Sequence, residues 1–222
     1  MSDNVLPSTG RPRLPARTTE ELFNSLSHGL AALLAVAGLV ILVVMGAIRG
    51  DAWYVVSYAV FGASAILLYS MSTVYHAARA PGVKRVLEVL DHSSIYALIA
   101  GSYTPYALTV LRPTVGWWVF GVVWGAAAVG IALKPFLMGR SKLFGMLAYV
   151  AMGWIIVFAW KPLKAVVDTR TIVFLAAGGL SYTAGTLFYM MKSKRWAHPV
   201  WHLFVGAGTV LHFFAALSLL PA

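Results

Sequence analysis

Residues 25–48 read SLSHGLAALLAVAGLVILVVMGAI, and this run of 24 residues contains no Asp, Glu, Lys or Arg. A helix that crosses the hydrocarbon core of a bilayer needs about 20 mostly apolar residues. The run is therefore long enough to span a membrane. It also starts too late and is too long for a cleaved secretory signal, whose apolar part has about 7–15 residues. We predict that it forms the first transmembrane helix.

Six further apolar runs follow, and short loops separate them. They cover residues 52–75, 90–111, 115–134, 143–160, 171–191 and 199–220. The chain of 222 residues is 60% hydrophobic and only 11% charged, whereas soluble domains carry about 25% charged residues. The runs do not alternate for long between apolar and polar residues, as the strands of a membrane β-barrel do. We predict an all-α membrane protein with seven transmembrane helices, which form one domain over residues 19–222.

Residues 1–18 differ in composition from the rest of the chain. Pro7, Gly10, Pro12 and Pro15 interrupt this segment, and such residues disfavour regular structure. We predict a disordered N-terminal arm. The chain contains no cysteine, which excludes disulfides and thiolate metal ligands and leaves the cellular compartment open.

The net charge of +10 would suit a nucleic-acid partner, but its distribution favours a membrane. Of the 17 Lys and Arg residues, 12 lie before the first predicted helix or in every second loop after it. The segments concerned are 11–17, 79–85, 134–142 and 192–195. Because basic loops stay in the cytoplasm, we expect a multi-pass protein of the cell membrane with its N-terminus in the cytoplasm and its C-terminus outside. We expect membrane lipids and no nucleic acid as partners; the sequence leaves the oligomeric state open.

Ionisable residues cluster at those helix ends that this topology places on the cytoplasmic side. Glu21 and His28 lie where the first helix begins, His76 where the second ends, and Asp91 where the third begins. His198 and His202 begin the seventh helix, and their i, i+4 spacing places both imidazoles on one face. Ionisable groups are costly in a bilayer, so this layer is a candidate functional site.

The side chains in this layer include a set of ligands that suits zinc. Zinc in proteins is bound by imidazole, thiolate or carboxylate groups, and catalytic sites keep one of four positions for water. His76, His198 and His202 supply three imidazoles and leave that fourth position. Asp91 could deprotonate or orient the water, or support a ligand from outside. The hydroxyl of Ser72, one helical turn before His76, could bind the water or a substrate carbonyl.

Some of these residues also have a purely structural interpretation. Glu21 and Asp91 each open a helix, where the helix dipole stabilises a carboxylate. His28, His92 and His212, taken singly, are as readily interpreted as hydrogen-bonded packing residues.

Five motifs along nearly the whole chain resemble those of the hemolysin III family, within the progestin and adiponectin receptor superfamily. They are ELFNSLSH at 21–28, STVYH at 72–76, DHSSIY with AGSYTP at 91–105, GGLSYTAG at 178–185 and HPVWH at 198–202. The resemblance implies a seven-helix fold with a cytoplasmic N-terminus. It also implies a zinc ion held by His76, His198 and His202, with the family's aspartate at Asp91 and its serine at Ser72. Glu21, Asn24 and His28 of the first motif would form a supporting shell.

The same resemblance implies three functions. Related receptors and alkaline ceramidases indicate a zinc-dependent hydrolase of lipid amides. The name of the bacterial branch indicates a pore-forming cytolysin. The third alternative is a regulator of membrane homeostasis, or a receptor, in which zinc is structural. The short N-terminal arm lacks the longer cytoplasmic segment of the receptors and disfavours a receptor role.

Overall fold

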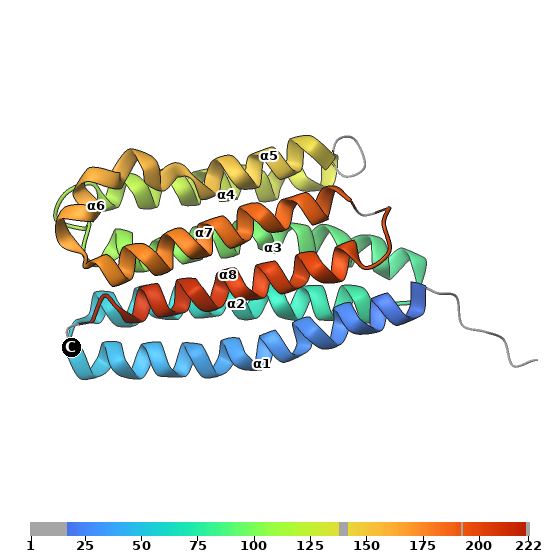
Figure 1. Ribbon diagram of the computed structural model, residues 1–222, viewed down its shortest axis with the longest axis horizontal. Coiled ribbons are helices and arrows are strands. Elements are labelled where there is room, and N and C mark those ends of the chain that lie inside the picture. The colour runs from blue at the N-terminus through green and yellow to red at the C-terminus, as the bar shows by residue number, and fades with distance from the viewer. Residues whose placement is uncertain (1–16, 138–141, 192, 221–222) are drawn as a thin grey trace, which may run out of the picture.

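The computed structural model describes residues 17–137, 142–191 and 193–220, and within these ranges every regular element is a helix. The helices are α1 (Arg17–Arg49), α2 (Ala52–Ala77), α3 (Pro81–Leu108), α4 (Gly116–Leu137), α5 (Lys142–Gly153), η1 (Ile155–Ala159), α6 (Trp160–Val166), α7 (Thr169–Met190) and α8 (Ala197–Leu217). They lie side by side in one elongated bundle (Figure 1). The arm predicted for residues 1–18 lies outside the described residues except at Arg17 and Thr18, which begin α1.

Six stretches in the described part of the chain are long and apolar enough to cross a membrane. They are α1, α2, α4, the run Leu143–Val166, α7 and α8. The membrane-spanning, all-helical prediction is confirmed to that extent. The span predicted at 90–111 corresponds to α3, which lies in the bundle but is not among the six. Its residues from Asp91 to Leu108 are almost all buried, polar ones included, because neighbouring helices surround it.

Short connections set the order of neighbours in the bundle. Gly50 takes a φ of +77° between α1 and α2, a conformation that glycine adopts at no steric cost. The Asp51 carboxylate then caps α2 by accepting a hydrogen bond from the Trp53 amide at 2.9 Å. Helix α2 packs on α1 and α3, α3 on α4, and α8 on both α7 and α1. The start of α1 and the end of α8 lie at opposite ends of the bundle (Figure 1).

The span predicted at 143–160 is interrupted. Helix α5 ends at Gly153, η1 follows as a 3₁₀ turn, and α6 continues to Val166. Tyr103 of α3 satisfies backbone groups at this break: its hydroxyl donates to the Gly153 carbonyl and accepts from the Ile156 amide at 3.0 Å. A break in a membrane helix is tolerated where neighbouring side chains supply such partners.

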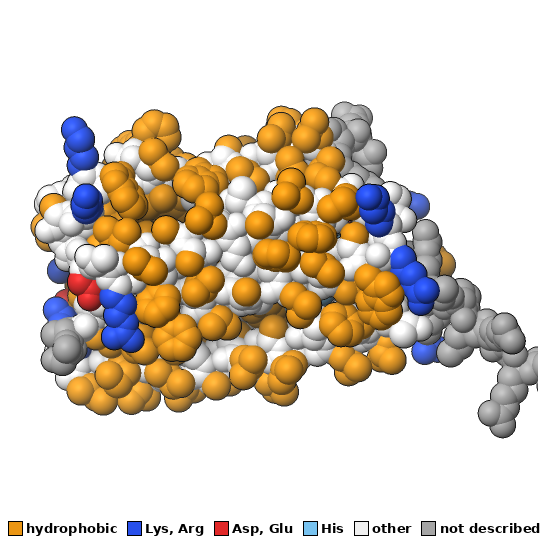
Figure 2. Space-filling model, in the orientation of Figure 1, with side chains coloured by type: hydrophobic (Ala, Val, Ile, Leu, Met, Phe, Trp, Pro, Cys, Tyr) orange, Lys and Arg blue, Asp and Glu red, His pale blue; other side chains and the backbone are white. Residues whose placement is uncertain are grey.

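Large apolar side chains cover the outside of the bundle, and charges gather at its two ends (Figure 2). Leu33 and Ile48 of α1, for example, are 70% and 75% exposed. Polar side chains such as Ser72, Asp91 and His202 are instead buried. This distribution suits a protein whose solvent is lipid along its length.

Candidate metal centre

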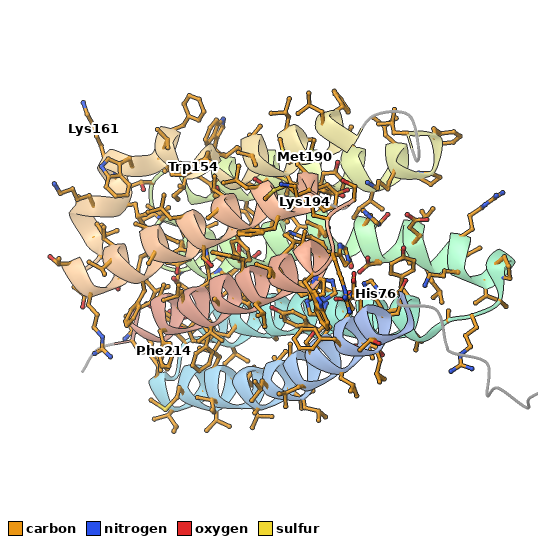
Figure 3. All side chains as sticks on the ribbon, turned by 45° about the vertical axis from the view of Figure 1, so that its right-hand side comes forward. His76, Trp154, Lys161, Met190, Lys194 and Phe214 are labelled. Carbon is orange, nitrogen blue, oxygen red and sulfur yellow. The ribbon has the colours of Figure 1, made fainter. Side chains whose placement is uncertain are left out.

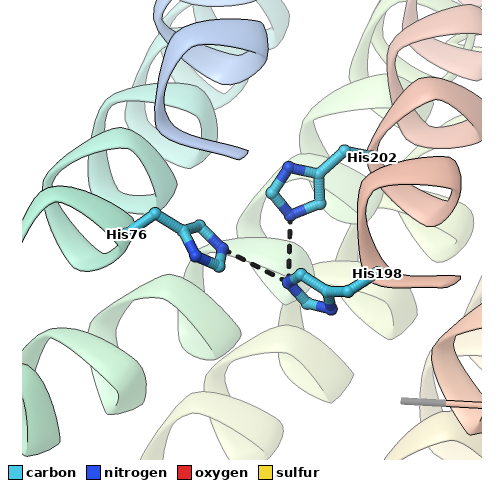
Figure 4. Close-up of side chains that lie close together, drawn as sticks. All are labelled: His76, His198 and His202. Carbon is cyan, nitrogen blue, oxygen red and sulfur yellow. Dashed lines mark hydrogen bonds between the residues drawn. The ribbon is translucent and has the colours of Figure 1, made fainter. Parts of the chain in front are cut away.

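Three histidines from two helices converge near the end of the bundle at which α1 starts (Figures 3 and 4). His76 lies in the last turn of α2, and His198 and His202 lie in the first two turns of α8. The Nε2 atom of His198 lies 3.2 Å from Nε2 of His76 and 3.2 Å from Nε2 of His202. All three side chains are buried, and their ligand atoms lie within 4.8 Å of one another. The sequence prediction that these imidazoles meet is therefore correct.

The entry into α8 fixes where two of these side chains lie. Trp196, directly before the helix, has a φ of +63°, in the left-handed region that non-glycine residues seldom adopt. Pro199 stands in the first turn, where its missing N–H breaks no helical hydrogen bond. The chain therefore turns sharply into α8, which begins at Ala197 and places His198 in its first turn.

Hydrogen bonds among the imidazoles cannot account for this geometry. Nδ1 of His76 lies 2.5 Å from Oε2 of Glu21; because a carboxylate only accepts, this Nδ1 carries the proton and Nε2 presents a lone pair. A neutral imidazole nitrogen is either a donor or an acceptor. The Nε2 of His198 can therefore satisfy only one of its two close neighbours. One cation bound by three lone pairs would satisfy all three nitrogens.

The spacing also fits the size of a metal ion. In a tetrahedral site with metal–nitrogen bonds of about 2.0–2.1 Å, neighbouring ligand nitrogens lie about 3.3–3.4 Å apart. The two distances of 3.2 Å are close to that value. The three residues can thus hold a metal ion.

Side chains from α1 and α3 support His76. The Oε1 atom of Glu21 accepts a hydrogen bond from Nζ of Lys84 at 2.9 Å, while its Oε2 accepts from His76. Such a carboxylate fixes the tautomer and the orientation of a metal-binding imidazole. Lys84 was not among the predicted site residues. Its charge identified it only as part of a basic loop, and nothing in the sequence places it beside Glu21.

His28 and Asn24 of α1 lie on the other side of the cluster. The imidazole of His28 stacks on that of His202, with ring centroids 3.6 Å apart, and Tyr69 approaches His28 edge-on at 5.1 Å. Asn24 is buried. All three residues of the predicted supporting shell thus come from the first turns of α1; Glu21 contacts His76, and His28 contacts His202.

The two predicted catalytic residues, Asp91 and Ser72, are both buried but lie on different helices, α3 and α2. Asp91 is buried near the start of the central part of α3, and its Oδ2 lies 3.8 Å from Nδ1 of His92. Its carboxylate does not belong to the compact group of three imidazoles. Ser72 is buried on α2, one turn before His76. His92 directs Nδ1 to the Glu88 carbonyl at 2.7 Å, which agrees with a packing role.

A cavity of about 430 Å³ begins beside this centre. Its wall includes His28, Asp91 and Trp201 near the histidines and continues along α3, α5, α7 and α8, where most of its lining is apolar. Ligand pockets of small molecules have volumes of about 300–1,000 Å³. His212, which the sequence indicated only as a packing residue, also lines it. The cavity itself was not predicted, because its wall combines residues that are distant along the chain.

The fold and the site together define the class: a helical, multi-span membrane protein with a buried cluster of three histidines beside an apolar cavity. The sequence model of the family described as "Haemolysin-III related" matches residues 16–213, and the chain belongs to that family. The resemblance to the hemolysin III family is thereby confirmed.

Relatives in two bacteria and in mammals match over most of their length. The Hemolysin-3 homolog of Bacillus subtilis (strain 168) is 40% identical over 198 residues, which cover 89% of this chain and 93% of the relative. Hemolysin-3 of Bacillus cereus is 38% identical, with 92% and 94% covered. The Monocyte to macrophage differentiation factor of Homo sapiens is 25% identical, with 88% and 82% covered, and this weaker similarity supports the wider receptor superfamily.

Proposed function

We propose that this protein is a zinc-dependent hydrolase of lipid amides in the cell membrane, with His76, His198 and His202 as the zinc ligands. The observation that carries the proposal is the convergence of three Nε2 atoms at 3.2 Å spacing beside an apolar cavity. Zinc rather than another metal is favoured because three imidazoles with one open position are typical of catalytic zinc sites.

The shape and position of the cavity favour a lipid as substrate. Trp154, Val157 and Leu180 line the cavity and are also 42%, 55% and 58% exposed on the outer surface of the bundle. The cavity wall thus continues to the lipid-facing surface between η1 and α7. An acyl chain can fill such a space without crossing water.

Each residue of the site receives a distinct role. When bound, zinc polarises a carbonyl and makes a water nucleophilic at neutral pH. Glu21 orients His76, and His28 packs against His202, so that the three lone pairs remain directed to one point. Asp91, which lines the cavity, accepts a proton from the attacking water. Ser72 donates a hydrogen bond to the developing oxyanion.

The proposal includes an orientation. Arg79 lies between α2 and α3, and Lys84 and Arg85 lie at the start of α3, at the end of the bundle where the metal centre is found. Because basic segments stay in the cytoplasm, the metal centre faces the cytoplasmic side of the cell membrane and the end of α8 faces outward.

Metal analysis of the purified protein, followed by assays with ceramides and other lipid amides, tests this function. We expect about one zinc per chain, turnover that a chelator abolishes and zinc restores, and loss of both metal and turnover in His202→Ala. His212→Leu removes a buried imidazole outside the cluster and should keep its metal. A stoichiometric zinc without turnover of any lipid amide would contradict the hydrolase and favour a structural zinc in a regulator or receptor.

The names of the two bacterial relatives favour cytolysis as the second candidate. Leakage of a dye from liposomes distinguishes the two functions. A pore-former releases the dye in proportion to its dose and without a lipid-amide substrate. We expect the purified protein, inserted in the bilayer, to leave the dye inside.

A further inference from the structure

Five tyrosines line the cavity, and they differ in whether their hydroxyls are free. The hydroxyls of Tyr103, Tyr149 and Tyr182 each hydrogen-bond to another group of the protein. That of Tyr106 is buried without a partner and lies out of reach of the cavity. The hydroxyl of Tyr189, a residue that is 8% exposed, makes no hydrogen bond with any described residue and is not closed off in this way. Tyr189 thus offers a free phenol to a ligand in the cavity.

Tyr189 stands at the end of the bundle where the metal centre lies. It belongs to the last turn of α7, and the neighbouring α8 carries its two candidate ligands in its first two turns. Met190, the next residue, lies nearer to the His76 end of the bundle than Phe214 does (Figure 3).

The side chain of Trp201 connects Tyr189 to the metal centre. The ring centroids of Tyr189 and Trp201 are 5.1 Å apart. The Trp201 ring in turn lies 5.0 Å from that of His198 and 5.3 Å from that of His202. Tyr189 is therefore one side chain away from two of the candidate ligands.

A second contact links Tyr189 to α3. Its ring centroid lies 6.3 Å from that of His92, the residue after Asp91. The carboxylates of Asp91 and Glu88 are the charges that act most strongly on the Tyr189 hydroxyl. Asp91 lines the same cavity. Tyr189 thus lies beside both the element that carries Asp91 and the element that carries two candidate ligands.

A free hydroxyl is unusual in this wall. The serine and threonine hydroxyls that line the cavity bond to backbone carbonyls of their own helices. A phenol presents one O–H donor, and leaving it unpaired in apolar surroundings is unfavourable. A ligand with an oxygen acceptor removes this cost, whereas a plain alkyl chain does not.

We propose that Tyr189 is a substrate-binding residue whose hydroxyl donates a hydrogen bond to the carbonyl oxygen of a lipid amide. An amide oxygen has two lone pairs, so it can accept from Tyr189 and still direct a lone pair to the metal. The acyl chain then extends from this point along the apolar wall of the cavity. The identity of the ligand rests on the proposed function.

The test measures binding instead of turnover. Palmitamide and hexadecane, whose chains have the same length, compete with a fluorescent fatty acid for the zinc-loaded protein in detergent micelles. We expect Tyr189→Phe to bind palmitamide about fivefold to tenfold more weakly than the wild type, the effect of one good hydrogen bond. It should bind hexadecane as the wild type does, and its zinc content should stay the same.

Tyr106→Phe is the matched control, because it removes a hydroxyl that the cavity does not reach. It should bind both compounds as the wild type does. Equal affinity of Tyr189→Phe and the wild type for palmitamide would overturn the proposal. So would an equal loss of affinity for hexadecane, which indicates a changed cavity shape, or a wild-type protein that binds palmitamide no better than hexadecane. Binding of the amide that depends on Tyr189 but leads to no hydrolysis would contradict only the hydrolase.

Discussion

At the scale of single residues, Glu21 accepts two side-chain hydrogen bonds beside the candidate metal centre. It stands on α1, accepts hydrogen bonds from His76 of α2 and Lys84 of α3, and thereby connects three helices at one ligand. The sequence identified Glu21 as a supporting residue through its motif. Its partner Lys84 lies 63 positions away, and no local pattern links the two.

Glu21→Gln should weaken metal binding by about 10- to 100-fold, because loss of the carboxylate frees the orientation and tautomer of His76. Competition between the protein and a chelator of known affinity measures the effect. Glu20→Gln is the matched control: Glu20 is the adjacent residue, and its carboxylate lies 3.7 Å from the exposed Arg195 instead of the metal centre. Equal affinities of the two variants would show that Glu21 does not orient the ligand.

At the scale of elements, close helix contact depends on where glycine occurs. A Cβ at Gly101 of α3 would lie 2.7 Å from Cβ of Ser64 on α2, and that backbone-attached atom cannot rotate away. A Cβ at Gly121 of α4 meets nothing within 4 Å. Small residues allow membrane helices to approach closely. Of these two glycines, Gly101 lies at such a close helix contact and Gly121 does not.

Gly101→Ala should therefore lower the free energy of unfolding by about 1–3 kcal/mol through overpacking. Gly121→Ala should be neutral or stabilising by up to about 1 kcal/mol, because alanine has the higher helix propensity. Unfolding of both variants in mixed detergent micelles measures the difference. Equal stability of the two would mean that α2 and α3 separate easily at Ser64.

The break between α5 and α6 depends on Tyr103. Tyr103→Phe leaves the Ile156 amide and the Gly153 carbonyl without their phenol partner, which should cost about 1–3 kcal/mol in local stability. Hydrogen exchange of residues 150–160 should accelerate. Tyr54→Phe loses only a long contact of 3.4 Å to the Leu219 carbonyl and should leave this segment unchanged. Unchanged exchange in Tyr103→Phe would show that the backbone at the break has other partners.

At the scale of the whole molecule, the two ends of the bundle carry different groups. The metal centre and the segment around Lys84 lie at one end, and α6 with Lys161 lies at the other (Figure 3). The bundle alone does not say which end faces the cytoplasm, because the helices would pack equally well in either orientation. The distribution of basic residues supplies the expected orientation.

The absence of cysteine allows a direct test of this orientation. In intact cells, a membrane-impermeant maleimide should label Lys161→Cys. It should label Arg85→Cys only after the cells are permeabilised. Both positions are exposed at helix ends. The opposite pattern would place the metal centre outside the cell and contradict the predicted topology.

The sequence by itself determined the helical membrane class, because apolar runs such as 25–48 have no stable arrangement in water. It also identified the three histidines as one group of candidate ligands. The i, i+4 spacing of one pair and the alternation of basic segments placed His76, His198 and His202 in one layer of the membrane. Its helix boundaries were less complete: α3 begins at Pro81, nine residues before the predicted start, and the fifth span is broken.

Only the tertiary structure decided the 3.2 Å geometry of the three nitrogens, the contact of Lys84 with Glu21, and the cavity that reaches His212. Hydropathy and charge act on each segment separately, so a sequence reveals which segments enter the membrane and which ends face the same side. The rotation and height of each helix result from packing against its neighbours. These two quantities determine which side chains meet, and they exist only in the assembled bundle.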